Sequence, residues 1–247
     1  MAIRFLIIIW TITSCSGFKH LDRAQEKFSK AAELELNPPP ESPEWPSFYY
    51  ALSYAHLQKS LHHVSNLKKY GLLSTALTLK ALCEWKLNRF EEALETSKEA
   101  LEIIQNTPRD KTLMTALPGL ILIEETEMKR KNVFKSPNEK EIFMFLTENI
   151  PGRLGFDILE LSKSEAFNDT DLLLYINQAS FAGLKVWSDT LNDLNQFIDA
   201  NSETNELREL FANQYLLYLE TKGKLFSDLE IISPESPQLH YWKKILL

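Results

Sequence analysis

Apolar residues recur at every third or fourth position along most of the chain from Leu21 onward. This spacing lines one face of an α-helix, and no stretch keeps the alternation of apolar and polar residues that is typical of a β-strand. The pattern predicts helices over residues 20–36, 47–63, 70–87, 90–105, 110–131, 138–149, 154–164, 170–186, 188–200, 204–222 and 236–246. The sequence therefore indicates an all-α chain of antiparallel neighbouring helices joined by short loops.

Prolines, glycines and capping residues set the expected helix boundaries. Three consecutive prolines at positions 38–40 interrupt the pattern, because proline cannot continue a helix and disfavours helical geometry in the preceding residue. Ser188 is typical of a helix start, and Gly223 marks a boundary after residue 222. Pro118 and Gly119 lie inside an apolar helical run, where they predict a kink or a break.

The first fifteen residues form a segment of their own. Arg4 is the only charged residue, and Phe5 to Ile12 form an apolar run about half as long as the roughly 20 residues that cross a bilayer. A short apolar run of this kind is typical of a secretory signal peptide. Residues 12–15, Ile-Thr-Ser-Cys, resemble the lipobox of bacterial lipoproteins.

The lipobox resemblance implies that signal peptidase II cleaves after Ser14 and that Cys15 carries the lipid. Residues 1–14 would be the signal peptide and residues 15–20 a lipid-anchored tether, held by more than one acyl chain because a single chain binds weakly. Ser16 follows the cysteine, which in enterobacterial sorting implies an outer-membrane lipoprotein that faces the periplasm. Two alternatives stay open: cleavage by signal peptidase I after Ser14 or Gly17, or a buried apolar helix at the N-terminus.

Composition and charge exclude some classes of partner. The formal net charge of −7 does not suit nucleic acid or anionic membrane surfaces, which proteins bind through lysine and arginine. Hydrophobic residues make up 44% of the chain, which is ordinary for a folded domain, and only 7 glycines favour helices over turn-rich sheets. If Cys15 carries lipid, Cys83 has no cysteine to pair with, and we expect it to be a buried thiol.

Two segments repeat a pattern of alanines with a larger residue between them. Ala93 and Ala100 lie within residues 91–102, and Ala24 and Ala31 lie 69 residues earlier in a similar segment. Small residues at these positions let neighbouring helices approach closely. Both segments resemble the second helix of the tetratricopeptide repeat (TPR), whose period of about 34 residues is close to half of that separation.

The TPR resemblance implies an irregular α-solenoid of antiparallel helical hairpins. TPR-like hairpins would occupy residues 21–135, and further hairpins without a recognisable consensus would continue the array over residues 136–247. Lys80 and Glu84 depart from the family pattern, because they stand where leucine and tyrosine are typical. The stretch from Leu61 to Leu72 is also too short for a full partner helix.

The best candidate for a binding surface is a cluster of aromatic residues. Five aromatic side chains lie within ten residues, which is more than one helical stripe usually buries: Trp45, Phe48, Tyr49, Tyr50 and Tyr54. Phe48, Ala51, Leu52 and Ala55 are expected to face the core, and tyrosine and tryptophan are favoured at interfaces. The candidate partner-binding residues are Trp45, Tyr49, Tyr50, Tyr54 and Trp85. The alternative is that the cluster lines the core beside the proline-rich loop.

No catalytic residue, metal site or cofactor is predicted. The histidines with the closest spacing are His56, His62 and His63, and this spacing does not suit a shared metal ion. A run of acidic residues is expected on the solvent-facing side of a helix rather than across a cleft: Glu124, Glu125 and Glu127. The sequence contains no nucleophile elbow, glycine-rich phosphate loop or His-Glu-x-x-His zinc motif.

These observations favour a lipid-anchored protein of the bacterial cell envelope. We expect it to act as a non-catalytic interaction scaffold that binds a protein partner through a TPR-like groove. Two alternatives belong to other functional classes. One is a small-ligand-binding accessory protein of an envelope transporter, and the other is a secreted α-helical enzyme.

Overall fold

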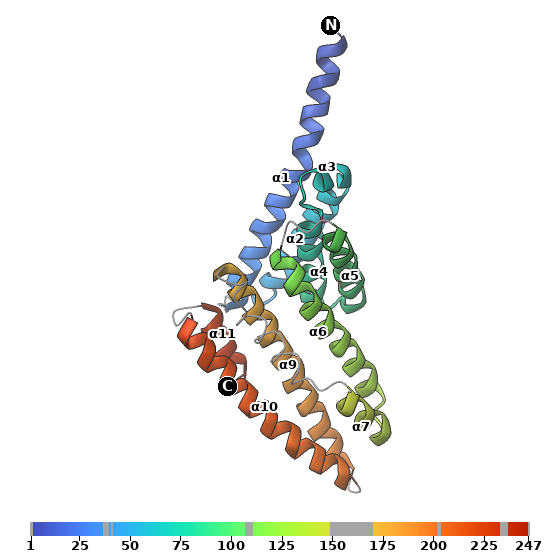
Figure 1. Ribbon diagram of the computed structural model, residues 1–247, viewed down its shortest axis with the longest axis vertical. Coiled ribbons are helices and arrows are strands. Elements are labelled where there is room, and N and C mark those ends of the chain that lie inside the picture. Colours follow the sequence, from blue (N-terminus) through green and yellow to red (C-terminus); the bar gives the residue numbers. More distant parts are fainter. Residues whose placement is uncertain are drawn as a thin grey trace. The chain divides into compact units, whose positions relative to one another are not determined.

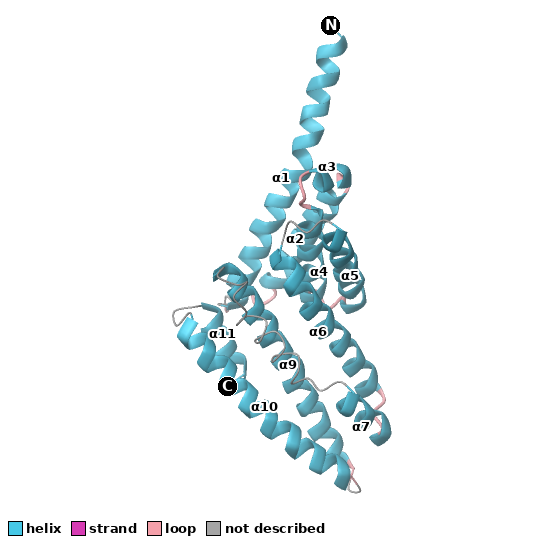
Figure 2. Cartoon of the chain, in the orientation of Figure 1, coloured by secondary structure: helices cyan, strands magenta, loops and turns pink. Residues whose placement is uncertain are grey.

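The computed structural model describes residues 2–36, 40, 42–106, 111–148, 170–201, 204–232 and 237–246. Every regular element in these ranges is an α-helix, and none of the described residues belongs to a β-strand (Figure 1 and Figure 2). The predicted all-α class is therefore confirmed for this part of the chain. The helix predicted over residues 154–164 lies outside the described residues.

The chain divides into two compact units, Met1–Leu117 and Pro118–Leu247. The helices that lie wholly in the first unit are α1 (Ala2–Leu36), α2 (Trp45–Leu61), α3 (Val64–Lys69), α4 (Leu73–Lys86) and α5 (Phe90–Asn106). The helices that follow are α6 (Lys111–Lys135), α7 (Glu139–Glu148), α9 (Thr170–Ala200), α10 (Asn205–Ile232) and α11 (Pro237–Leu246). The division falls inside α6, because Leu117 packs into the core of the first unit.

Small residues fill the helix contacts of the first unit, where α1 packs on α2, α2 on α4 and α4 on α5. Ala24 and Ala31 of α1 and Ala93 and Ala100 of α5 are all completely buried, at 0% exposure. Because alanine ends at Cβ, helices that meet at alanines approach more closely than helices that meet at leucines. The burial that the alanine pattern predicts is confirmed.

Two serine hydroxyls fasten α2 to α1. Ser53 donates a hydrogen bond to the carbonyl of Ala24 and Ser60 donates one to the carbonyl of Gly17, each at 2.8 Å. At Gly17 an added Cβ would lie 2.9 Å from the Cβ of His63, so a larger residue would push the chain apart. The side of α2 that faces the core is therefore partly polar, and each serine hydroxyl is satisfied by a backbone carbonyl of α1.

The connections of the first unit are short. The turn from α4 to α5 contains Asn88 with a positive φ of 59°, a left-handed conformation that asparagine tolerates better than most residues. Between α2 and α4 the chain forms only α3, a helix of 6 residues. The absence of a full partner helix in this stretch was predicted from its length and is confirmed.

Large side chains form two cores among the described residues of the second unit. Trp187 of α9 is completely buried, and its ring meets that of Tyr218 of α10 edge-on with centroids 5.4 Å apart. Around this pair lie Leu184, Leu191, Leu225, Phe226, Leu239 and Leu246. The other core joins α7 to α9 and α10 through Ile142, Phe145, Leu146, Leu194, Ile198 and Leu207.

The first helix is longer than predicted. We expected it to begin near residue 20, but α1 begins at Ala2, so the segment assigned to a tether, residues 15–20, is helical in the structure. Residues 2–36 contain no proline and one glycine, Gly17, so no residue in this stretch breaks the helix.

Two predicted helix boundaries are also wrong, because α9 and α10 continue through them. Helix α9 passes through Ser188, and the carboxylate of Asp189 is bound at 2.6 Å by Lys185 within the same helix instead of capping a new one. Helix α10 passes through Gly223, since one glycine costs only about 1 kcal/mol relative to alanine. Pro118 lies inside α6, where its side chain is exposed.

Candidate partner-binding surface

The aromatic residues of α2 differ sharply in burial, and Tyr50 belongs to the core. Only 2% of Tyr50 is exposed, its hydroxyl donates to Oε2 of Glu35 at 2.8 Å, and its ring contacts Phe28 edge-on. Lys86 of α4 binds both carboxylate oxygens of Glu35, at 2.8 and 2.9 Å. Tyr50 therefore ties α1, α2 and α4 together, and we leave it out of the proposed binding surface.

Tyr54 is half-buried beneath two cations. The Nζ of Lys80 lies 5.9 Å and the Cζ of Arg89 lies 5.0 Å from the centroid of its ring, within the range of cation–π attraction. Lys80 also binds Glu84 at 2.6 Å and donates to Thr96 at 2.7 Å. The two residues that depart from the TPR pattern, Lys80 and Glu84, thus form an ion pair within α4 beside the tyrosine, and the bond from Lys80 to Thr96 links α4 to α5.

The first turns of α2 expose aromatic surface. Trp45 is 45% exposed and Phe48 is 56% exposed, while Tyr49 is half-buried with its ring edge-on to Phe48 at 5.6 Å. We call Trp45, Phe48 and Tyr49 the α2 aromatic surface. Large apolar side chains that stay exposed next to one another are typical of an interaction site.

The expectation that these residues face the core is wrong for Phe48, Ala51 and Ala55, which are exposed, while Leu52 is half-buried. The buried residues of α2 are Tyr50, Ser53, Leu57 and Ser60. The sequence pattern misled because two of the four core positions are serines, whose hydroxyls bind carbonyls of α1.

Trp85 lies near the C-terminal end of α4, next to the turn into α5. Its ring is half-buried and meets Phe90 edge-on, with centroids 4.8 Å apart. This contact holds the turn, so Trp85 has a structural role in addition to the binding role predicted for it.

The lipidation site predicted at Cys15 lies outside the residues whose side chains are described. The backbone at this position belongs to α1. Among the described residues, no helix combines the length and the apolar character needed to cross a membrane.

One histidine pair was missed by sequence reasoning. Nδ1 of His20 on α1 and Nδ1 of His56 on α2 are 3.2 Å apart, and the two rings are stacked. Burial lowers the pKa of both histidines, and for His20 the charge of His56 lowers it further. The pair could not be found from the spacing of histidines within α2, because His20 lies on α1, 36 residues before His56.

The described residues contain no group of three or more histidine, cysteine, aspartate or glutamate side chains that could hold a metal ion. Cys83 is completely buried and its Sγ donates to the hydroxyl of Ser53 at 3.3 Å. Burial raises the pKa of Cys83 to about 12, so the unreactive thiol is the stable form. The expectation of a buried thiol is confirmed.

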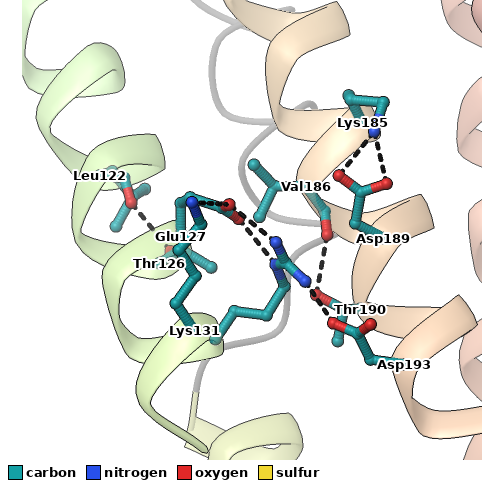
Figure 3. A network of polar contacts seen from close by, with 10 residues as sticks. Leu122, Thr126, Glu127, Lys131, Lys185, Val186, Asp189, Thr190 and Asp193 are labelled. Carbon is teal, nitrogen blue, oxygen red and sulfur yellow. Dashed lines mark hydrogen bonds and ion pairs between the residues drawn. The ribbon is translucent and has the colours of Figure 1, made fainter. Parts of the chain in front are cut away.

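The acidic residues of α6 do not lie on a solvent-facing side, which corrects our expectation. Glu124 is completely buried and Glu127 is 6% exposed. Glu127 accepts two hydrogen bonds from Arg130, at 2.7 and 2.8 Å, and Arg130 also binds Asp193 of α9 (Figure 3). Arg130 makes the burial of Glu127 tolerable, because a buried carboxylate needs a charged partner with good hydrogen-bond geometry.

The ion pairs around Arg130 connect α6 with α9. Arg130 binds Glu127 of its own helix and Asp193 of α9. Figure 3 shows Lys131 beside Glu127, and Lys185 bound to Asp189 one turn before Asp193. Each acidic group in this network faces a cation, so the side chains join α6 to α9.

No protein-family model matches this chain, and no curated protein or solved structure is significantly similar to it.

Proposed function

We propose that this chain is a lipid-anchored, non-catalytic protein of the bacterial cell envelope that binds a protein partner. The α2 aromatic surface carries the proposal. Trp45 and Phe48 are 45% and 56% exposed although both are large and apolar, and such residues dominate the energy of protein interfaces.

The TPR-like interpretation is part of this proposal. It is supported by the complete burial of Ala24, Ala31, Ala93 and Ala100 where helices of the first unit meet. Stacked hairpins of this kind present an extended surface to a partner. The α2 aromatic surface would bind the apolar part of such a partner, while the tyrosine hydroxyl of Tyr49 adds a polar contact.

The anchor is the other part of the proposal. The Ile-Thr-Ser-Cys sequence that ends at Cys15 would place the helices at the membrane, with the outer membrane as the expected location. A net charge of −7 supports a protein partner over nucleic acid or a bare anionic membrane.

Site-specific crosslinking tests the binding surface. A photoreactive phenylalanine derivative at position 48 of the full chain should give one discrete adduct with another protein in intact bacterial envelopes. Trp45→Ala should reduce the yield about tenfold, because truncating a central aromatic contact costs upward of about 1.4 kcal/mol. The same derivative at Phe143, which is 41% exposed in the second unit, is the matched control. An identical adduct from position 143, or no reproducible adduct from position 48, would contradict the proposal.

Replacing the cysteine tests the anchor separately. Cys15→Ala should abolish incorporation of labelled palmitate and release the chain from the membrane fraction, because two or more acyl chains supply stable attachment. Cys83→Ala should retain the label, since Cys83 is buried. If Cys15→Ala keeps both label and membrane association, the anchor is wrong while the binding surface can still be tested.

A further inference from the structure

Helix α10 has apolar residues on two sides. Leu207, Leu225 and Phe226 are buried in the cores, and a second apolar group is exposed. Tyr215, Leu216, Leu217 and Leu219 are exposed by 44%, 65%, 39% and 38%. The buried side also includes two polar residues, Gln214 at 9% and Thr221 at 1% exposure. An amphipathic helix that packs only onto its own chain normally exposes a polar side, so the exposed apolar group needs a separate explanation.

Four residues form a continuous stripe along the exposed side of α10: Ala212, Leu216, Leu219 and Gly223. We call them the α10 stripe. Their spacing of four, three and four residues keeps them on one side of a helix, and all four are exposed. Tyr218, which packs on Trp187, points to the opposite side.

Gly223 indicates what kind of surface fits the stripe. A Cβ added there would meet no atom within 4 Å, so packing within the chain does not require a glycine. A glycine inside an exposed helix destabilises it, and a glycine at such a position is explained by the close approach of another backbone. Ala212 at the other end of the stripe is also small.

We propose that the α10 stripe is covered by the same stripe of a second copy of this chain, with the two helices antiparallel. The spacing of four, three and four residues reads the same in both directions, as a two-fold axis between identical surfaces requires. The axis places Ala212 opposite Gly223 of the partner subunit and Leu216 opposite Leu219 of the partner subunit. Each small residue thus faces a small one, and each leucine faces a leucine.

The charges beside the stripe fit this arrangement. On one edge, Glu220 comes to lie beside Asn213 of the partner subunit, whose amide can donate to the carboxylate. On the other edge, Tyr215 of the partner subunit comes to lie beside the aliphatic part of Lys222, whose Nζ is held by the carbonyl of Leu246 in its own chain.

The proposed contact is small, because it involves only one helix from each copy. Stable, specific interfaces bury roughly 1,200 Å² or more, so we expect a weak association that depends on the protein concentration. Attachment of both copies to one membrane would raise their local concentration, although the inference itself does not depend on the proposed anchor.

Sedimentation of the full chain in non-ionic detergent, from about 1 µM to about 300 µM, tests the proposal. The wild-type chain should shift from monomer to dimer over this range. Leu219→Lys should weaken dimerisation at least about tenfold, whereas Leu217→Lys should leave it unchanged. Leu217 is the matched control for Leu219. Both leucines lie on α10 and are 39% and 38% exposed, but only Leu219 lies in the stripe.

Gly223→Leu distinguishes a lost contact from a damaged fold. Leucine is a better helix former than glycine, so this variant should unfold at a higher temperature than the wild type while dimerising at least about tenfold more weakly. A wild-type chain that stays monomeric, equal losses in Leu219→Lys and Leu217→Lys, or full dimerisation of Gly223→Leu would overturn the proposal. A monomer whose binding to vesicles depends on Leu219 would also overturn it, because the stripe would then contact lipid.

Discussion

The two units of this chain hold their helices together in different ways. In the first unit, α1, α2, α4 and α5 meet at completely buried alanines such as Ala24 and Ala93, and serine hydroxyls bind carbonyls of the neighbouring helix. In the second unit, α9, α10 and α11 meet at large side chains such as Trp187 and Phe226. Leucines such as Leu57 and Leu77 also fill the core of the first unit, so the difference lies in its additional close contacts at alanines and serines.

This difference explains why only the first unit contains a recognisable motif. Alanine at a close contact cannot be exchanged for another residue without moving a helix, so the position leaves a clear trace in the sequence. A core of large residues tolerates many combinations of similar volume, so it leaves no fixed pattern. Helix contacts at alanines can thus be recognised in a sequence more readily than a core of large side chains.

The largest effect is expected from removing volume in the second unit. Trp187→Ala should lower the free energy of unfolding by about 3–5 kcal/mol, because it deletes a completely buried ring that packs on Tyr218. Trp45→Ala, which removes an exposed ring, should change it by less than about 0.5 kcal/mol. Urea denaturation measures both variants.

Hydrogen exchange shows whether the effect of Trp187→Ala stays in the second unit. Amides of α9 and α10 should exchange faster, whereas those of α4 and α5 should keep their protection, since each unit has its own core. Equal loss of protection in α4 and α5 would break the comparison, because the two units would then unfold as one.

In the first unit, adding volume at a close contact between helices is expected to lower the stability. Ala93→Leu should lower the free energy of unfolding by about 1–3 kcal/mol, because three added carbon atoms must fit where α5 approaches its neighbour. Ala55→Leu, at an exposed position of α2, is the matched control and should be nearly neutral. If Ala93→Leu is as mild as Ala55→Leu, the contact is not close and the comparison fails.

The sequence predicted the helical class and most helices, because the periodic spacing of apolar residues reports directly on secondary structure. It failed at Ser188 and Gly223, where α9 and α10 continue. Residues that favour a helix end do not force one when the apolar spacing continues beyond them, and at Asp189 a lysine one turn earlier satisfies the carboxylate.

The candidate site was predicted only in part, since sequence spacing cannot show which polar groups meet across helices. The aromatic cluster of α2 was found, but Tyr50 is held in the core by Glu35 and Phe28, which lie on α1. Phe48 was expected inside and is exposed, because serines take its place against α1. The burial of Glu127 was missed for the same reason, since Arg130 and Asp193 are needed to explain it.

A smaller effect should come from a polar group that the second unit buries. Oε1 of Gln214 is buried and has no hydrogen-bond partner among the described residues, in contrast to the bonded serines of the first unit. Gln214→Leu should raise the free energy of unfolding by about 1 kcal/mol, because it removes an unsatisfied acceptor and keeps the volume. Gln105→Leu, at an exposed position of α5, is the control. A clear loss of stability in Gln214→Leu would indicate that the amide makes a necessary hydrogen bond.

The smallest effect concerns pH and should be confined to the first unit, where His20 of α1 stacks on His56 of α2. Burial lowers the pKa of both histidines in the folded state, so the unfolded chain binds protons more readily at pH values below about 6.5. Stability should therefore be fully present above about pH 6.5 and should fall as the pH drops through the lowered pKa values.

Hydrogen exchange at about pH 7.5 and about pH 5 measures this effect once the intrinsic exchange rates are corrected for pH. Amides at the contact of α1 with α2 should lose protection at the lower pH, whereas those of α9 and α10 should change little, because the second unit contains a single histidine, His240. His56→Phe should remove much of the difference, while His62→Phe, at an exposed position, should keep it. Because both rings are partly exposed, solvent screens the charges and the effect should stay below those of Trp187→Ala and Ala93→Leu. An equal loss of protection in α9 and α10 would show that acid acts on the whole chain rather than on the histidine pair.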